Sequence, residues 1–70
     1  MEKITITTEF IRLDGALKLS GRCPTGGEAK ALIQGGQIAV NGEVCTMRGK
    51  KLRPGDRFTG FGRTVEVCAG

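Results

Sequence analysis

The chain has 70 residues, of which 39% are hydrophobic and 26% charged, a composition typical of one small globular domain and unlike that of a disordered tail. It lacks an apolar run of the roughly 20 residues that cross a bilayer, and Met1 to Thr8 lacks the order of a signal peptide, so we expect a cytoplasmic protein without a membrane partner. Eleven Lys and Arg residues against seven Asp and Glu give a net charge of +4, which favours an anionic partner without identifying it.

The first third of the chain predicts a strand and a helix. Ile4 and Ile6 alternate with threonines, a pattern typical of a short, half-buried strand. Apolar residues then recur at helical spacing from about Arg12 to Ser20, and Gly21 follows where a left-handed cap would lie. We therefore expect a first helix over this segment.

A second helix is predicted from about Gly26 to Gln34. It opens with the Thr-x-x-Glu pattern of a capping box, formed by Thr25 and Glu28, and it stops at Gly35-Gly36. Lys30 falls on the polar side of this helix. The residues expected to face the core are Ala29, Leu32 and Ile33.

The second half of the chain predicts strands. Asn41-Gly42 between two short β-prone segments is typical of a hairpin with a type I′ turn, and Pro54-Gly55 marks another turn. The last two strands are expected at residues 57–59 and 63–67. The order of elements predicts a single α+β domain over residues 1–70, with two short helices packed on a small, mostly antiparallel sheet.

The sequence offers little for catalysis. The chain has no histidine, which excludes Ser-His and Cys-His nucleophiles, and its acids are scattered without a close pair for acid-base chemistry or magnesium. Cys23, Cys45 and Cys68 are widely spaced and odd in number, so we interpret them as reduced thiols. Its glycines match neither a nucleotide P-loop nor a dinucleotide fingerprint. We expect no enzyme activity, metal, cofactor or small-molecule substrate.

Basic residues are concentrated in one stretch of ten residues, in which Asp56 is the only acid. They are Arg48, Lys50, Lys51, Arg53 and Arg57. This cluster favours contacts with phosphates, and a solvated loop is the alternative interpretation. At Thr25-Gly26-Gly27, the start of a helix exposes backbone N–H groups to which a phosphate could approach closely. The alternative there is a tight turn between the helices.

Three phenylalanines are the only aromatic residues. Phe10 and Phe58 lie in patterns typical of the core, whereas Phe61, between two glycines, either stacks on a base or packs over the edge of the sheet. A protein with few rings and many cations is better suited to recognising backbone and shape than to reading bases.

Several blocks between Ile11 and Phe58 follow one another in a specific order and spacing. They are Arg12-Leu13-Asp14, then Ala29-Lys30 with Leu32-Ile33, then Gly36, Ile38 and Val40-Asn41-Gly42, and finally Leu52-x-Pro54-Gly55-Asp56. With these blocks the chain resembles the RNA-binding domain named after small-subunit ribosomal protein four, also called the alpha-L motif, and is similar to its stand-alone YbcJ and YaaA type. Many members carry Ser-Arg where this chain has Thr25-Gly26, and Arg22 is the candidate substitute for that arginine.

The resemblance implies a protein that binds structured RNA, such as ribosomal or transfer RNA, through the two helices and the hairpin region. Carried over by position, the candidate RNA-binding residues are Arg12, Lys18, Thr25, Gly26, Lys30 and Asn41. Charge adds Arg22, Arg48, Lys50, Lys51 and Arg53. We expect a monomer. The alternatives are a protein-protein adaptor and a ubiquitin-like sulphur carrier, although Ala69-Gly70 lacks the double glycine of such carriers.

Overall fold

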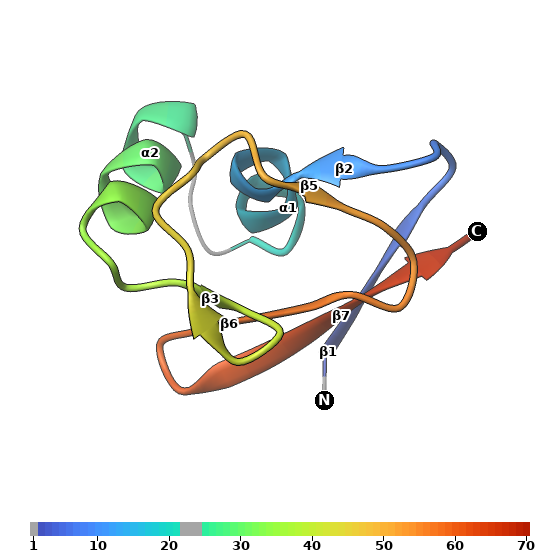
Figure 1. Ribbon diagram of the computed structural model, residues 1–70. Coiled ribbons are helices and arrows are strands. Elements are labelled where there is room, and N and C mark those ends of the chain that lie inside the picture. The colour runs from blue at the N-terminus through green and yellow to red at the C-terminus, as the bar shows by residue number, and fades with distance from the viewer. Residues whose placement is uncertain (1, 22–24) are drawn as a thin grey trace.

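A computed structural model describes residues 2–21 and 25–70. A five-stranded sheet lies beneath a layer that contains both helices and a second, two-stranded sheet (Figure 1). The elements in chain order are β1 (Glu2–Ile6), β2 (Ile11–Arg12), α1 (Leu13–Leu19), α2 (Gly26–Gln34), β3 (Ala39–Val40), β4 (Glu43–Val44), β5 (Lys51–Leu52), β6 (Arg57–Gly60) and β7 (Arg63–Ala69). The predicted α+β class, with two short helices on a mostly antiparallel sheet, is confirmed.

The large sheet has the strand order β1-β7-β6-β3-β4. Only β1 and β7 pair in parallel, and the other neighbours are antiparallel. The period-two pattern of β1 puts Ile4 and Ile6 into the core and leaves Thr5 exposed, as expected for a sheet with one covered face. Strand β7 runs two residues beyond its predicted end because Cys68 and Ala69 continue the pairing with β1.

Two tight hairpins shape the sheet. The predicted Asn41-Gly42 turn joins β3 to β4 with positive φ values of 51° and 88°. A second such turn, Phe61-Gly62, joins β6 to β7, and it leaves Phe61 59% exposed. Gly60 precedes this turn inside β6, where an added Cβ would lie only 2.6 Å from Cδ1 of Ile38, so a larger residue here would force the Ile38 side chain to shift.

The helices follow the sequence signals closely. Helix α1 begins one residue later and ends one residue earlier than predicted, and Gly21 beyond it has the expected positive φ of 80°. Helix α2 has the predicted bounds, and the Thr25 side chain accepts a hydrogen bond of 3.3 Å from the backbone N–H of Glu28. Ala29 and Ile33 are buried, whereas Leu32 is half-buried at the edge of the core.

The core lies between the large sheet and the upper layer. Its members are Ile4, Ile6, Leu13, Ala16, Leu17, Ala29, Ile33, Ile38, Val40, Leu52, Phe58, Val65 and Val67. Phe58 is buried as predicted, but the core assignment of Phe10 is wrong, because its side chain is only partly buried and lies outside this cluster. Among the described residues, no buried side chain is polar or charged, and no helix is long and apolar enough to cross a membrane.

Candidate RNA-binding surface

The two-stranded sheet brings Arg12, the first basic residue of the motif blocks, next to the cluster of basic residues that begins at Arg48. Strands β2 and β5 pair antiparallel, with Ile11 opposite Leu52 and Arg12 opposite Lys51. Opposed residues in such a pair point to the same face, so Leu52 is fully buried while Arg12 and Lys51 are both exposed. Lys51 and Leu52 therefore form a short strand and not a loop, while contacts of the basic cluster with phosphates stay a prediction.

The start of helix α1 is fixed to residues 48–53, which we call the basic segment. The backbone N–H of Leu13 donates to the carbonyl oxygen of Lys50 at 2.8 Å, and that of Asp14 donates to the carbonyl oxygen of Arg48 at 3.1 Å. The first N–H groups of a helix have no acceptor inside the helix, so here main-chain carbonyls of the basic segment take the place of a capping side chain. Helix and segment thus hold each other in place through backbone bonds.

Arg12 is oriented by its neighbours. Its Nη2 lies 3.4 Å from Oδ2 of Asp14, whose Oδ1 accepts the backbone N–H of Gly15 at 2.8 Å. The same guanidinium nitrogen passes 3.8 Å from the point where a Cβ would stand on Gly49. The side chain of Arg12 therefore lies along the basic segment.

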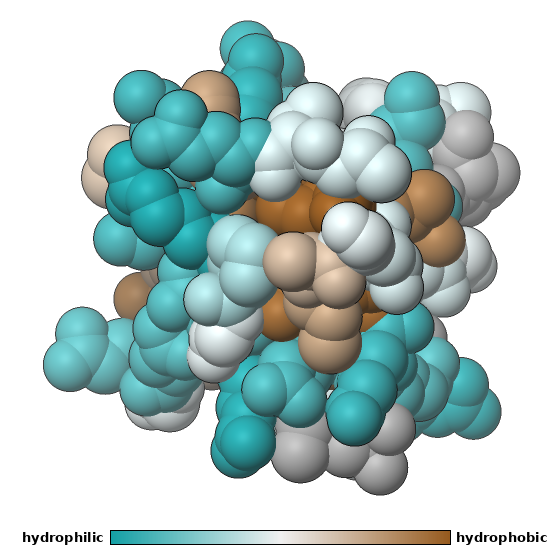
Figure 2. All heavy atoms as spheres, turned by 90° about the vertical axis from the view of Figure 1, so that its right-hand side faces the viewer, coloured by the Kyte–Doolittle hydropathy of each residue, from teal (hydrophilic) through white to brown (hydrophobic). Residues whose placement is uncertain are grey.

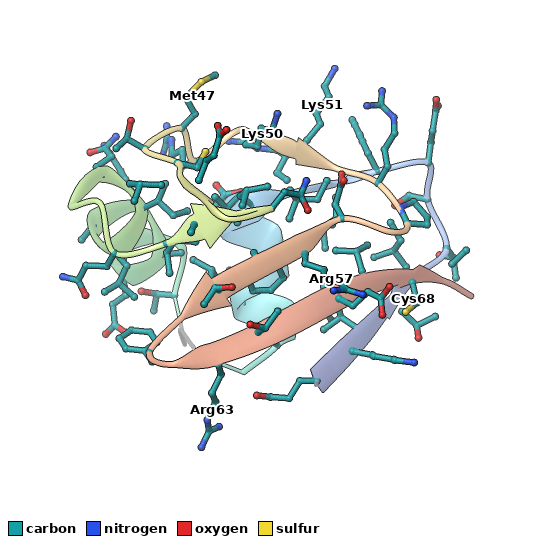
Figure 3. All side chains as sticks on the ribbon, turned by 60° about the horizontal axis from the view of Figure 1, so that its bottom comes forward. Met47, Lys50, Lys51, Arg57, Arg63 and Cys68 are labelled. Atoms are coloured by element: carbon teal, nitrogen blue, oxygen red, sulfur yellow. The ribbon has the colours of Figure 1, made fainter. Side chains whose placement is uncertain are left out.

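Four cations of the basic cluster are available to bind an anion. Within residues 2–21 and 25–70, Arg48, Lys50, Lys51 and Arg53 form no ion pair, and all four are exposed. Figure 3 shows the side chains of Lys50 and Lys51 pointing away from the molecule, on the side opposite Arg63. Unpaired, exposed cations can approach an anion without first breaking an internal ion pair.

The two helices add cations to the same layer. Lys18 in the last turn of α1 and Lys30 on α2 are exposed, and both helices lie on the same side of the large sheet as β5 (Figure 1). We define the basic face as the exposed cations of this layer, which are Arg12, Lys18, Lys30, Arg48, Lys50, Lys51 and Arg53. Arg22, also predicted to bind RNA, lies outside the described residues.

The N-terminus of α2 is open to solvent. A Cβ added to Gly26 would meet nothing within 4 Å, and one added to Gly27 would meet only Oγ1 of Thr25 at 3.9 Å. In the described part of the chain, the N–H groups of these glycines have no acceptor. Packing against the described residues therefore does not explain the two glycines.

Asn41 has a structural role in this fold. Its Oδ1 accepts the backbone N–H of Arg57 at 3.0 Å, and its Nδ2 donates to Oδ1 of Asp56 at 3.2 Å. The other carboxylate oxygen of Asp56 accepts the backbone N–H of Arg53 at 2.8 Å. Asn41 and Asp56 thus tie the β3–β4 turn to the Pro54-Gly55 turn, while an RNA contact by Asn41 stays a prediction.

This arrangement predicts an acid-sensitive link. The hydrogen bond from the Arg53 backbone holds the pKa of Asp56 below its ordinary value of 3.8, with help from Asn41 and from the charges of Lys50 and Arg53 and against the effect of burial. A carboxyl group whose pKa is lower in the folded than in the unfolded state stabilises the fold at any pH above its unfolded-state pKa. This stabilisation is lost as the pH falls through its folded-state pKa.

Asp56→Asn should lower the free energy of unfolding at neutral pH by about 1 kcal/mol, because one charged acceptor is lost. It should also make stability less dependent on pH below 3.8. Urea unfolding at several pH values, followed by circular dichroism, measures both effects. If acidification lowers the free energy of unfolding equally in parent and variant, the Asp56 carboxylate is not the group that makes stability depend on pH.

Metal-binding and redox features are sparse. No group of three or more His, Cys, Asp or Glu side chains gathers in the described residues as a metal site would require. Cys45 and Cys68 are half-buried free thiols, and Cys23 lies outside the described residues. The chemistry of this surface is that of cations and backbone N–H groups.

Comparison with known proteins agrees with the motif blocks. The sequence profile of the S4 domain matches residues 4–68 of this chain. The chain belongs to the S4 domain family. This S4 domain is also similar to the Probable ribosome maturation protein RlbA of Bacillus subtilis (strain 168), with 41% identity over 61 residues that cover 84% of this chain and 86% of the relative. The family resemblance predicted from the sequence is therefore confirmed.

Proposed function

We propose that this S4 domain protein binds structured RNA of the ribosome or its precursors through the basic face, without catalysing a reaction. The relative from Bacillus subtilis is named as a probable ribosome maturation protein, which supports ribosomal RNA as the target. Such a protein would work in the cytoplasm as a single domain and, in our proposal, as a monomer.

The observation that carries this proposal is the fixed geometry of the basic segment. Backbone hydrogen bonds from Leu13 and Asp14 to the carbonyls of Lys50 and Arg48, together with the β2–β5 pair, hold its main chain against α1. A fixed row of cations can match the regular spacing of phosphates on an RNA helix, and less conformational freedom is lost on binding than for a loose tail.

The second helix offers a different kind of phosphate contact. The N–H groups of Gly26 and Gly27 have no acceptor among residues 2–21 and 25–70, and they lie at the positive end of the α2 dipole. In our proposal one RNA phosphate occupies this position, with Thr25 beside it and Lys30 one turn along the helix. The target would be recognised mainly by shape and backbone.

The structure disfavours one of the two alternative functions, the sulphur carrier. A sulphur carrier must offer a mobile C-terminal glycine to its activating enzyme, whereas the N–H of Gly70 donates to the carbonyl oxygen of Ile6 at 2.8 Å beside strand β1. A protein-protein adaptor would use the basic face for an acidic partner, and this face would then show no preference for RNA.

Binding of a labelled RNA hairpin, measured by fluorescence anisotropy at increasing salt, tests the proposal. If five cations each neutralise one phosphate, a plot of log K against log salt should have a slope between about −4 and −5. A slope near zero, or weaker binding to the hairpin than to a polyglutamate of the same charge, would favour the adaptor.

A further inference from the structure

A hollow of about 410 Å³ lies at the end of the small sheet, next to the basic segment. It is lined by Thr8, Glu9, Phe10, Lys51 and Arg53. The antiparallel register brings these residues together, because its continuation beyond Ile11 and Leu52, where the ladder ends, places Phe10 opposite Arg53. This end of the molecule faces the viewer in Figure 2, where apolar residues are accessible at the centre between hydrophilic ones.

Phe10 is the unusual member of this set. Its ring is partly exposed and does not belong to the core, and Nζ of Lys51 lies 4.9 Å from the ring centroid. The hydroxyl of Thr8 donates to the carbonyl oxygen of Phe10 at 2.8 Å and fixes the turn that presents the ring. Burial in the core therefore does not account for this aromatic residue.

We propose that this hollow binds one unpaired nucleotide of the RNA held by the basic face, with the base stacked on Phe10 and its phosphate contacted by Lys51 and Arg53. The inference rests on the proposed function and adds base-stacking to it. An aromatic ring beside two exposed cations is the combination with which proteins bind single-stranded nucleotides. The RNA would then be a helix with a bulge or a helix-to-loop junction next to it.

The rim of the hollow suits a nucleotide better than an acidic peptide. The Glu9 carboxylate can accept hydrogen bonds from the exocyclic amine of a base or from a ribose 2′-hydroxyl, which are donors that the acidic side chains of a peptide lack. The Lys51 ammonium over the ring belongs to an exposed, flexible side chain that can turn to a phosphate and leave the ring face to the base.

The test compares two RNAs, a blunt duplex and the same duplex with one bulged adenosine. The parent should bind the bulged RNA about tenfold more tightly, since stacking of one base on an aromatic ring has about this effect. Phe10→Leu, which keeps an apolar side chain, should abolish the preference and leave duplex binding and its salt slope unchanged. Phe10→Tyr, which keeps a ring, should retain the preference.

A fluorescent base gives a second, direct measurement. With 2-aminopurine in the bulge, the parent and Phe10→Tyr should quench its emission on binding, and Phe10→Leu should not. If the parent binds both RNAs equally, or if Phe10→Leu keeps preference and quenching, the nucleotide site is wrong while the proposed function stands. If the parent binds neither RNA at low salt, the proposed function fails and the nucleotide site fails with it.

Discussion

Leu52→Ala should remove a large part of the stability of the fold, lowering the free energy of unfolding by about 3 kcal/mol. Leu52 is fully buried and is the residue by which β5 is attached to the core. A domain of this size has a total stability of roughly 4–10 kcal/mol, so the variant should retain only about 1–7 kcal/mol and unfold at a clearly lower urea concentration. RNA binding should weaken with it, because the cations on either side of Leu52 lose their fixed positions.

Lys50→Ala is the matched control for this prediction. Its side chain is exposed, and the substitution keeps the backbone carbonyl that accepts the N–H of Leu13, so the change in stability should stay within about 0.5 kcal/mol. Urea unfolding followed by far-ultraviolet circular dichroism measures both variants, since the chain has no tryptophan or tyrosine for fluorescence. An unchanged midpoint for Leu52→Ala would contradict the role of β5 in the core.

The double substitution Lys50→Glu and Lys51→Glu should reduce the affinity for structured RNA by about 100-fold or more. Two attractive contacts are lost and two repulsive ones are added at the centre of the basic face. The fold should persist, because both side chains are exposed and the backbone bonds of β5 remain. Circular dichroism of the variant checks this directly.

The control has the same change in net charge at a distant place. Lys3→Glu with Arg63→Glu alters two exposed cations of β1 and β7, and Figure 3 places Arg63 on the side opposite Lys50 and Lys51. This variant should bind RNA far better than the double variant of β5. If both variants lose affinity equally, net charge attracts the RNA and the basic face has no special role.

Local signals in the sequence predicted much of the fold. The Asn41-Gly42 turn and the bounds of α2 were predictable because each depends on residues within a few positions of one another, in a type I′ turn and in the Thr25 cap. The family was predictable from blocks whose order and spacing do not depend on any single residue.

The small sheet could not be predicted in this way. Strands β2 and β5 have two residues each and pair segments that lie about forty positions apart, so no periodic pattern marks them. The capping of α1 by the carbonyls of Arg48 and Lys50 has no sequence signature either, because every residue has a carbonyl. The charge pattern therefore predicted the cluster of basic residues but not the β2–β5 pair and the backbone hydrogen bonds from α1 that hold it in place.

Two residues were interpreted from their neighbours in sequence, and the tertiary structure gives each another environment. Phe10 was assigned to the core from a core-like sequence pattern, but it lies at the end of the small sheet beneath Lys51. Asn41 was carried over as an RNA contact, whereas its side chain bonds to Asp56 and Arg57, 15 and 16 positions away. Long-range contacts of this kind decide roles that local patterns leave open.

The most direct test of a single folded basic face compares salt titrations of RNA binding for the parent, for Lys30→Glu and for the β5 double variant. Lys30 lies on α2, about twenty positions from Lys50 in sequence, and its exposed side chain should affect stability by no more than about 0.5 kcal/mol. We expect Lys30→Glu to weaken binding and to reduce the slope of log K against log salt by about one unit, and the double variant to reduce it by about two. If the double variant abolishes binding while Lys30→Glu binds RNA like the parent, the helices do not share one face with the basic segment and this account is wrong.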